Sequence, residues 1–148
     1  FNGSELQKLQ LGKIQGDIEH FDLTIEKENQ QIVLAAIKAG VVASAHDCAE
    51  GGVAVALAEA SFPKGFGLDV RTTMTTAKLF SETQSRFVLT TSPENKAAFE
   101  TIVGEKATLI GQVTTEKRII IQASDGEIDV ATQVAYRNWK EAIECLMK

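Results

Sequence analysis

Cysteine, histidine and proline are scarce in this chain of 148 residues, which contains two of each. Two cysteines cannot provide the disulfide framework that holds small secreted domains together, and neither belongs to a Cys-x-x-Cys pair. The two histidines, His20 and His46, lie at no metal-ligand spacing from Cys48 or Cys145. We therefore expect a protein of a reducing compartment, the cytoplasm, without a cysteine–histidine metal centre.

Clusters of positive charge and long apolar runs are also missing. Fifteen lysines and arginines face 20 aspartates and glutamates, the net charge is −5, and the arginines are scattered along the chain. This balance argues against a nucleic-acid-binding surface. No stretch is apolar for long enough to span a bilayer, and no signal peptide is visible. We expect neither nucleic acid nor membrane as a partner. Since the first residue is Phe1 and not methionine, we expect a processed product or an excised part of a longer protein.

The common motifs of nucleotide and acyl-transfer chemistry are absent as well. The chain has no Gly-x-x-x-x-Gly-Lys-Ser/Thr phosphate loop, no Gly-x-Ser-x-Gly elbow and no cysteine–histidine pair at a known spacing. Activity on ATP therefore cannot be argued from these motifs.

What is present is the composition of an ordinary globular domain. Hydrophobic residues make up 44% and charged residues 24%, and the length suits a single domain, residues 1–148, with one sizeable core. Helical and strand-like segments together predict an α+β fold, in which a mixed sheet has helices packed mainly on one side. The order of elements in the latter half also allows a ferredoxin-like regulatory module, which would bind a ligand without catalysing a reaction.

Local signals place most of the elements. Ser4 and Gln7 have the spacing of a capping box, which predicts a short helix over 5–11 that ends at Gly12. Apolar spacing predicts a second helix over 26–39, with a glycine as its stop. We also predict a buried helix over 53–60, a helix from Pro93 to Gly104, and a last helix that carries Ala135, Trp139, Ala142 and Leu146 on one stripe, with Trp139 as a core anchor. The predicted strands are 68–70, 86–91, 108–113, 118–123 and 127–131. A two-residue hairpin turn is predicted at Asp125-Gly126.

The first chemically suggestive segment is the glycine corner, residues 46–52. A short apolar segment leads into His46 and Asp47, and the pair Gly51-Gly52 then opens an alanine-rich helix. Glycines allow left-handed backbone angles and close approach, and a helix start has unpaired N–H groups, so Gly51 and Gly52 are candidates for holding a phosphate. The other interpretation is that the two glycines let a buried helix turn tightly from a strand, and the local residues alone favour it.

Asp47 and Glu50 add two carboxylates to this corner. Carboxylates here could hold Mg²⁺ against a phosphate, because Mg²⁺ takes few protein oxygens and completes its shell with substrate oxygens. The alternative is that both stabilise a helix N-terminus through its partial positive charge. We predict a metal contact for Asp47 and a structural hydrogen bond for His46.

The second suggestive segment is the 81–86 loop, Ser-Glu-Thr-Gln-Ser-Arg. As a ligand loop it would offer hydroxyl and amide groups to ribose and phosphate, with Arg86 as a bidentate anion clamp. The alternative is a solvated connection whose hydroxyl groups satisfy nearby backbone groups. On the first interpretation the ligand-binding residues are Ser81, Glu82, Gln84 and Arg86, together with Gly51 and Gly52 of the glycine corner.

Both segments carry a family resemblance. Residues 46–59 resemble the His-Asp-x-x-x-Gly-Gly-x-Ala-x-Ala-Leu-Ala-Glu motif in the C-terminal domain of the aminoimidazole ribonucleotide synthetase-like superfamily. Residues 79–88 resemble the Leu-Phe-Ser-Glu-Ser-Gln-Ser-Arg segment of the phosphoribosylformylglycinamidine synthase family, and residues 2–7 and 139–143 are similar to the boundaries of its last domain. The chain departs from that family at Cys48-Ala49, where Val-Ser is more common.

The resemblance implies the C-terminal domain of a large synthetase subunit, with the fold of that superfamily. The family's enzyme is a carbon–nitrogen ligase of purine biosynthesis that uses ATP and Mg²⁺ to convert formylglycinamide ribonucleotide to the amidine with glutamine-derived ammonia. Implied partners are the N-terminal domains of the same synthetase, a glutaminase subunit and a small bridging subunit. Because the ATP site and the catalytic histidine of the family belong to preceding parts, the resemblance implies no catalytic residue here and an inactive isolated fragment.

Two alternatives stay open at this point. Thiamine monophosphate kinase, selenophosphate synthetase and the hydrogenase maturation dehydratase have similar C-terminal domains, although the 81–86 loop and the ending Trp-Lys-Glu-Ala-Ile argue against them. The second alternative is a non-catalytic regulatory or interaction module that binds a small metabolite or a neighbouring domain.

Overall fold

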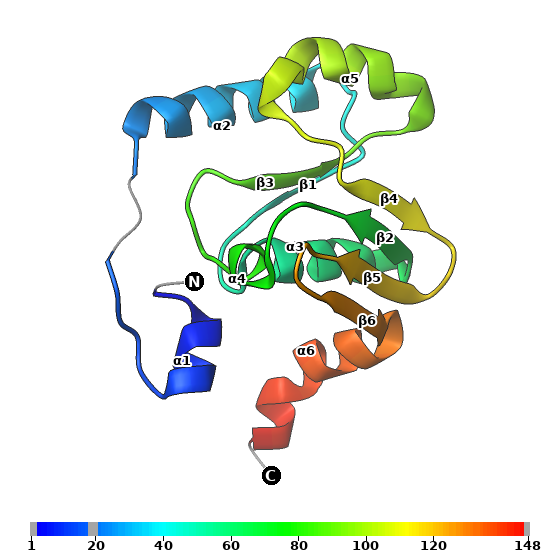
Figure 1. Cartoon of the computed structure of the whole chain (residues 1–148). Coiled ribbons are helices and arrows are strands. Elements are labelled where there is room, and N and C mark those ends of the chain that lie inside the picture. Colours follow the sequence, from blue (N-terminus) through cyan, green and yellow to red (C-terminus); the bar gives the residue numbers. More distant parts are fainter. Residues whose placement is uncertain (1–2, 18–20, 147–148) are drawn as a thin grey trace. The chain divides into compact units, whose positions relative to one another are not determined.

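A computed structural model describes residues 3–17 and 21–146 of the chain, with side chains as far as residue 142 (Figure 1). The chain forms two compact units. The first comprises residues 1–56 and 80–109, and the second comprises residues 57–79 and 110–148. Among the helices of the described ranges, none combines the length and apolar character needed to cross a membrane.

The first helix, α1 (Glu5–Leu11), has the predicted bounds and the predicted cap. The hydroxyl of buried Ser4 accepts a hydrogen bond from Gln7 N at 3.2 Å. The Gln7 side-chain oxygen reaches back and accepts from Gly3 N at 3.1 Å. Gly12 ends the helix in the left-handed conformation at φ 68°. All of these bonds are local, which is why the sequence pattern was sufficient to predict them.

Helix α2 (Leu23–Lys38) begins three residues before the predicted start. The Asp22 carboxylate caps it by accepting hydrogen bonds from Thr24 N at 2.7 Å and Ile25 N at 3.2 Å. An N-cap of this kind satisfies two of the N–H groups that a helix start leaves without partners. In the first unit α2 packs against α5 (Lys96–Val103). Short 3₁₀ turns, η2 (Pro93–Asn95) and η3 (Gly104–Lys106), form the two ends of the segment predicted as one helix.

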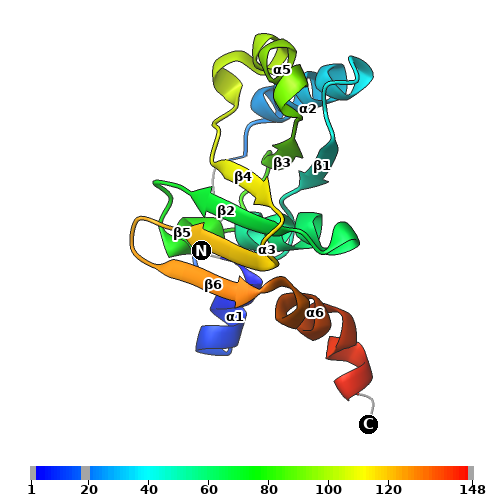
Figure 2. The same cartoon turned by 90° about the vertical axis from the view of Figure 1, so that its right-hand side faces the viewer.

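The strands β1 (Ser44–Asp47) and β3 (Phe87–Thr90) form an antiparallel pair in the first unit (Figure 2). Their register runs from Ser44↔Thr90 to Asp47↔Phe87. Just beyond the pair, Cys48 N donates to Arg86 O at 3.0 Å. The pairing therefore brings the end of the 81–86 loop beside the start of the glycine corner.

Helix α3 (Gly52–Ser61) follows the glycine corner, and its alanine-rich sequence is buried as predicted. Between 2% and 6% of Val53, Ala54, Ala56 and Leu57 is exposed. Helix α3 begins in the first unit and ends in the second. The 3₁₀ turn η1 (Phe62–Lys64) follows it directly.

The second unit contains a four-stranded mixed sheet in the order β4-β2-β5-β6. Its strands are β2 (Gly67–Arg71), β4 (Gly111–Thr114), β5 (Arg118–Gln122) and β6 (Glu127–Ala131). Strands β2 and β5 are parallel, and the other neighbours are antiparallel. Successive side chains alternate between faces, so Leu68, Val70, Ile119 and Ile121 are buried on one face. The predicted class, α+β with a mixed sheet and helices, is confirmed, with β1 and β3 as a separate two-stranded sheet.

The strand predicted over 108–113 begins later than the pattern indicated. Strand β4 starts at Gly111, which lies opposite Val70 in the register. A side chain at Gly111 would overlap the backbone of Asp69, so the glycine permits the close approach of β4 to β2. Leu109 and Ile110, which precede it, were predicted as strand because they are apolar. A local pattern of this kind cannot show where pairing with the neighbouring strand begins.

The hairpin turn between β5 and β6 is displaced by one residue from the predicted Asp125-Gly126 pair. Ala123 N donates to Gly126 O at 2.8 Å, so Ser124 and Asp125 are the central residues. The Asp125 carboxylate accepts from Thr76 N at 2.7 Å and from the Thr76 hydroxyl at 2.8 Å. These bonds, the backbone one foremost, lower the pKa of Asp125. A contact with α4 (Thr76–Leu79), 49 residues away, thus outweighs the local preference for Asp-Gly.

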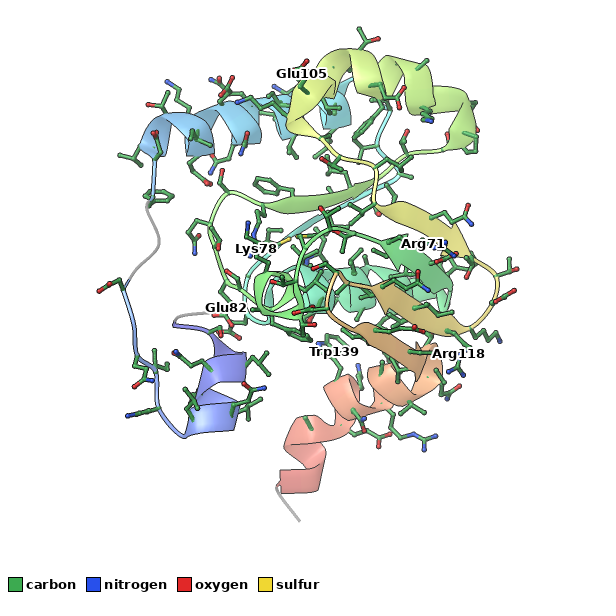
Figure 3. All side chains as sticks on the ribbon, viewed as in Figure 1. Arg71, Lys78, Glu82, Glu105, Arg118 and Trp139 are labelled. Atoms are coloured by element: carbon green, nitrogen blue, oxygen red, sulfur yellow. The ribbon has the colours of Figure 1, made fainter. Side chains whose placement is uncertain are left out.

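The last helix, α6 (Thr132–Leu146), carries Trp139 at the surface and not in the core as predicted. About half of Trp139, 51%, is exposed. Its ring lies 5.4 Å from that of Phe62 and 6.0 Å from that of Tyr136, and its Nε1 donates to Glu59 Oε1 at 2.7 Å (Figure 3). Trp139 therefore holds α6 to the end of α3 and η1 through a surface cluster with one polar bond. The predicted stripe ends at Leu146, whose side chain lies outside the described ones.

Gly67→Ala tests the close packing of this sheet. The added Cβ would overlap the carbonyl oxygens of Glu116 and Arg118, which are backbone atoms and cannot move aside cheaply. We expect the free energy of unfolding to fall by about 2–3 kcal/mol. Gly126→Ala is the control, because its Cβ would meet only the Thr76 hydroxyl at 3.4 Å. Urea unfolding of both variants measures the difference, and equal midpoints would contradict the packing argument.

Candidate functional site

The two segments singled out from the sequence meet in the first unit. Besides the β1–β3 pairing, Glu82 Oε1 of the 81–86 loop accepts a hydrogen bond from Gly51 N of the glycine corner at 3.0 Å. Segments about 30 residues apart in the sequence are thus joined by a side-chain bond. The candidate site consists of the glycine corner and the 81–86 loop.

Glu82 is the central contact of this site (Figure 3). The same Oε1 atom also accepts from Glu5 N at 2.8 Å, so one carboxylate oxygen takes two backbone N–H groups. Glu5 is the first residue of α1, and Gly51 immediately precedes α3. Bonds to a carboxylate are stronger than those between neutral groups. Glu82, which we predicted as a ligand contact, here ties the loop to α1 and to the glycine corner.

The two glycines of the corner are explained by the path of the chain. Gly51 and Gly52 have φ of 76° and 64°, in the left-handed region that favours glycine. A Cβ on Gly51 would overlap the side chain of Val55. Gly52 N donates to Ala49 O at 3.0 Å, and Gly51 N donates to Glu82. Both N–H groups have partners within the chain, so a phosphate at this corner would have to displace at least one of these bonds.

Hydrogen bonds within the 81–86 loop fix its shape. The hydroxyls of Ser81 and Thr83 lie 2.6 Å apart and share a hydrogen bond. Arg86 donates from Nε to Thr83 O at 3.1 Å and from its terminal nitrogen to Ser81 O. The guanidinium predicted as an anion clamp therefore holds carbonyl groups of its own loop. A guanidinium has five N–H donors, so holding two carbonyls does not exhaust it.

Asn29 of α2 is a residue of this site that sequence reasoning missed. Its Nδ2 donates to Ser85 Oγ at 2.9 Å and to Ser85 O at 3.2 Å. A signal was present in the sequence, because Asn29 shares helical spacing with the inward residues Ile32, Val33 and Ala36. An asparagine in that stripe needs a polar partner, but nothing in the pattern identifies Ser85, 56 residues away.

His46 and Asp47 lie at the end of β1. His46 Nδ1 is 2.6 Å from Asp47 O, and since a carbonyl only accepts, the hydrogen must be on Nδ1. The Asp47 side chain is 74% exposed. The described residues contain no group of three or more histidine, cysteine, aspartate or glutamate side chains that could hold a metal ion. A single exposed carboxylate can contribute only one ligand to Mg²⁺, so phosphate and water oxygens would have to complete the coordination shell. The metal contact of Asp47 stays a prediction in this form.

Residues 4–124 match a protein family described as "AIR synthase related protein, C-terminal domain". The chain belongs to this family. The match includes the glycine corner and the 81–86 loop, and it confirms the superfamily resemblance drawn from residues 46–59. The AIR synthase related domain described here therefore has both candidate segments inside the span that the family model matches.

Solved structures of PurL from Thermotoga maritima have the same fold. The complex with FGAR is 22% identical over 77% of this chain, with a TM-score of 0.68. The complex with ATP is 22% identical over 81%, with a TM-score of 0.69, and the structure of PurLQS is 21% identical over 86%, with a TM-score of 0.67. This chain spans only 21%, 23% and 24% of those chains, respectively.

Cys48 is a buried thiol in this AIR synthase related domain. Burial raises its pKa to about 11, nearby Asp47 adds to the rise, and the Arg86 guanidinium lowers it in part. Only 6% of the residue is exposed. The thiolate is the reactive form, so neither charge nor access favours a nucleophile here.

Glu82→Ala tests the double hydrogen bond. Removal of the carboxylate leaves Glu5 N and Gly51 N without their internal acceptor, so we expect the free energy of unfolding to fall by about 1–2 kcal/mol. Glu82→Gln keeps a neutral acceptor and should cost less. Glu105→Ala, at an exposed glutamate of η3, is the matched control. Thermal unfolding compares the three, and a Glu82→Ala variant as stable as the control would refute the role.

Alkylation by iodoacetamide tests the Cys48 thiol. In a Cys145→Ser background at pH 8, a pKa of about 11 leaves about a hundredfold less thiolate than the ordinary cysteine pKa of 9.0 would give. We expect the folded chain to react at least that much more slowly than the same chain in urea. Mass spectrometry follows the reaction, and equal rates in both states would contradict the burial argument.

Proposed function

We propose that this chain is the C-terminal domain of a PurL-type synthetase that converts formylglycinamide ribonucleotide to its amidine. The observation that carries the proposal is the likeness to PurL over 77–86% of this chain, in structures that include complexes with FGAR and with ATP. The 79–88 segment adds support, because it resembles the corresponding segment of that enzyme family. Membership of the AIR synthase related family makes an ATP-dependent synthetase the first expectation.

The proposed reaction has two steps. The amide oxygen of the substrate attacks the γ-phosphorus of ATP, the bond from that phosphorus to the bridging oxygen breaks, and ADP leaves. Ammonia then adds to the activated carbon, the carbon–oxygen bond breaks, and inorganic phosphate departs as the nitrogen loses a proton. Positioning and charge neutralisation dominate such transfers, and bound Mg²⁺ would supply part of that neutralisation.

The proposed part of this chain in that reaction is binding and support, without a catalytic residue. The candidate contacts are Gly51, Gly52, Ser81, Glu82, Gln84 and Arg86 for a phosphoribosyl or nucleotide ligand, and Asp47 for Mg²⁺. Gln84 and Asp47 are exposed, and so can meet a ligand without rearrangement. Glu82 and Arg86 would have to exchange bonds within the chain for bonds to the ligand.

Exposed apolar side chains support the proposal that a larger protein surrounds this chain. Eight large apolar side chains between residues 9 and 37 are at least 46% exposed. They are Leu9, Leu11, Ile14, Phe21, Leu23, Ile25, Leu34 and Ile37. Such a concentration is typical of surfaces that another domain covers. We propose the N-terminal domains of the same synthetase as that cover, with a glutaminase and a small bridging subunit as partners in the cytoplasm.

Reconstitution tests the proposed function. The chain is mixed with the remaining N-terminal part of the same synthetase, and ADP release is followed with formylglycinamide ribonucleotide, ammonia, ATP and Mg²⁺. We expect release that requires both pieces and the ribonucleotide, because neither piece alone has the complete site. Omission of ammonia and of the ribonucleotide are the controls.

Two results would contradict the proposal. Association of the pieces without activity on this substrate would rule out the amidine-forming reaction, and the substrates of the other superfamily members would then be assayed. Substrate-dependent ADP release by the chain alone would show that the fragment is itself catalytic.

A further inference from the structure

The turn between β5 and β6 contains the only Asp-Gly pair of the chain, Asp125-Gly126. The backbone nitrogen of a residue that follows aspartate can attack the side-chain carboxyl carbon, and glycine hinders this attack least because it has no Cβ. Every other aspartate of the chain is followed by a residue that carries a side chain. Asp125 and Gly126 are both exposed, so water reaches the turn. This turn is therefore the aspartate site where such an attack on the side chain is sterically easiest.

Thr76 holds the carboxylate of Asp125. The Oδ1 atom of Asp125 accepts from Thr76 N at 2.7 Å and from the Thr76 hydroxyl at 2.8 Å. The neighbouring Ser124 N donates to Met74 O at 3.0 Å. Three hydrogen bonds thus join the tip of the turn to residues 74–76, although the pairing of β5 with β6 already closes it.

The bonds from Thr76 oppose the attack in two ways. Ring closure needs the carboxyl carbon of Asp125 to meet Gly126 N, and a carboxylate held at α4 is not free to fold back onto its own backbone. Ring closure also expels a carboxyl oxygen as water, which is easier from the protonated acid than from the carboxylate. The bonds from Thr76, the backbone one foremost, favour the ionised form and so lower the pKa of Asp125. Both effects reduce the population that can react.

We propose that Asp125-Gly126 is a modification site, at which the aspartate isomerises through a cyclic imide when Thr76 releases its carboxylate. Gly126 N forms a bond to Cγ of Asp125, and the amide proton leaves with the carboxyl OH as water. Water then adds to one of the two carbonyl carbons of the imide and breaks the bond from that carbon to the nitrogen. Opening at the side-chain carbonyl restores aspartate, and opening at the main-chain carbonyl gives isoaspartate. The water lost in the first step is regained in the second, so no other reactant is needed.

Isoaspartate would disturb the hairpin, because the main chain would then run through Cβ and Cγ of Asp125 and contain one more carbon atom. The register that pairs Gln122 with Glu127 and Ile121 with Ile128 depends on a turn of two residues. Ile121 is a core residue, with 1% of its surface exposed. Thr76 therefore protects the covalent structure of a turn on which the sheet depends. This inference does not depend on the proposed function.

The test is incubation of the chain at neutral pH for several weeks, followed by tryptic peptide mapping. Isoaspartate changes the retention time of peptide 119–137 but not its mass. We expect the unaltered chain to form isoaspartate about tenfold more slowly when folded than in guanidinium chloride, because reaction of the folded chain requires local opening. Gly126→Ala should suppress the product in both states, since its Cβ hinders the attack.

Two variants of Thr76 release the carboxylate in steps. Thr76→Val removes the hydroxyl donor and should raise the rate in the folded chain about threefold. Thr76→Pro removes both donors and should raise it about tenfold. Proline suits this position, because Thr76 is the first residue of α4. Thr101→Val, at an exposed threonine of α5, is the matched control and should leave the rate unchanged.

Circular dichroism shows which variants are folded, and Thr76→Val decides the role of Thr76 if Thr76→Pro does not fold. Equal rates in the folded and denatured unaltered chain would overturn protection by the fold. Folded Thr76 variants that react as slowly as the unaltered chain would overturn the role of Thr76. Absence of isoaspartate at residue 125 in the denatured chain, or its undiminished formation in Gly126→Ala, would overturn the modification site itself.

Discussion

One carboxylate oxygen joins three parts of the first unit that are remote in the sequence. Glu82 Oε1 accepts from Glu5 N and from Gly51 N, and so connects the 81–86 loop to α1 and to the glycine corner. Both donors lie at helix starts, where N–H groups lack partners and the helix dipole is positive. A half-buried carboxylate loses some of its hydrogen bonds to water, and two backbone N–H groups at helix starts replace them. The geometry of the candidate site follows from this exchange.

The same bond limits what the glycine corner can do. The sequence made Gly51 a candidate phosphate contact, because a left-handed turn before a helix can expose N–H groups, although the local residues alone favoured a tight structural turn. The structure places the carboxylate of Glu82 at that N–H, so an incoming anion would compete with an anion already tethered there. Groups that point outward have no such competitor. Among the proposed contacts, the exposed Gln84 and Asp47 therefore need less rearrangement to meet a ligand than Gly51 and Arg86 do.

The accuracy of prediction depended on how local the deciding bonds were. Helix α1 was correct because Ser4, Gln7 and Gly12 cap it within a few residues. The β5–β6 turn was wrong by one residue because Thr76 captures Asp125 from a distant segment. In the site, the family resemblance identified the corner and the loop, but no pattern could show that Glu82 bonds to Gly51. Helical spacing likewise placed Asn29 in the inward stripe of α2, but it could not identify Ser85 as the partner.

The presence of Ser85 in a strained turn is hard to explain by chain connection alone. The loop needs only to lead from α4 to β3, and a glycine at this position would adopt the same φ without cost. The serine instead provides a hydroxyl that accepts a hydrogen bond from Asn29, and this bond restricts the backbone conformation of the turn. Backbone strain of this kind lowers the stability of the folded chain. A rigid loop also loses less conformational entropy when it binds a ligand. The two bonds from Asn29 therefore hold Ser85 in a turn conformation that a serine alone would rarely adopt.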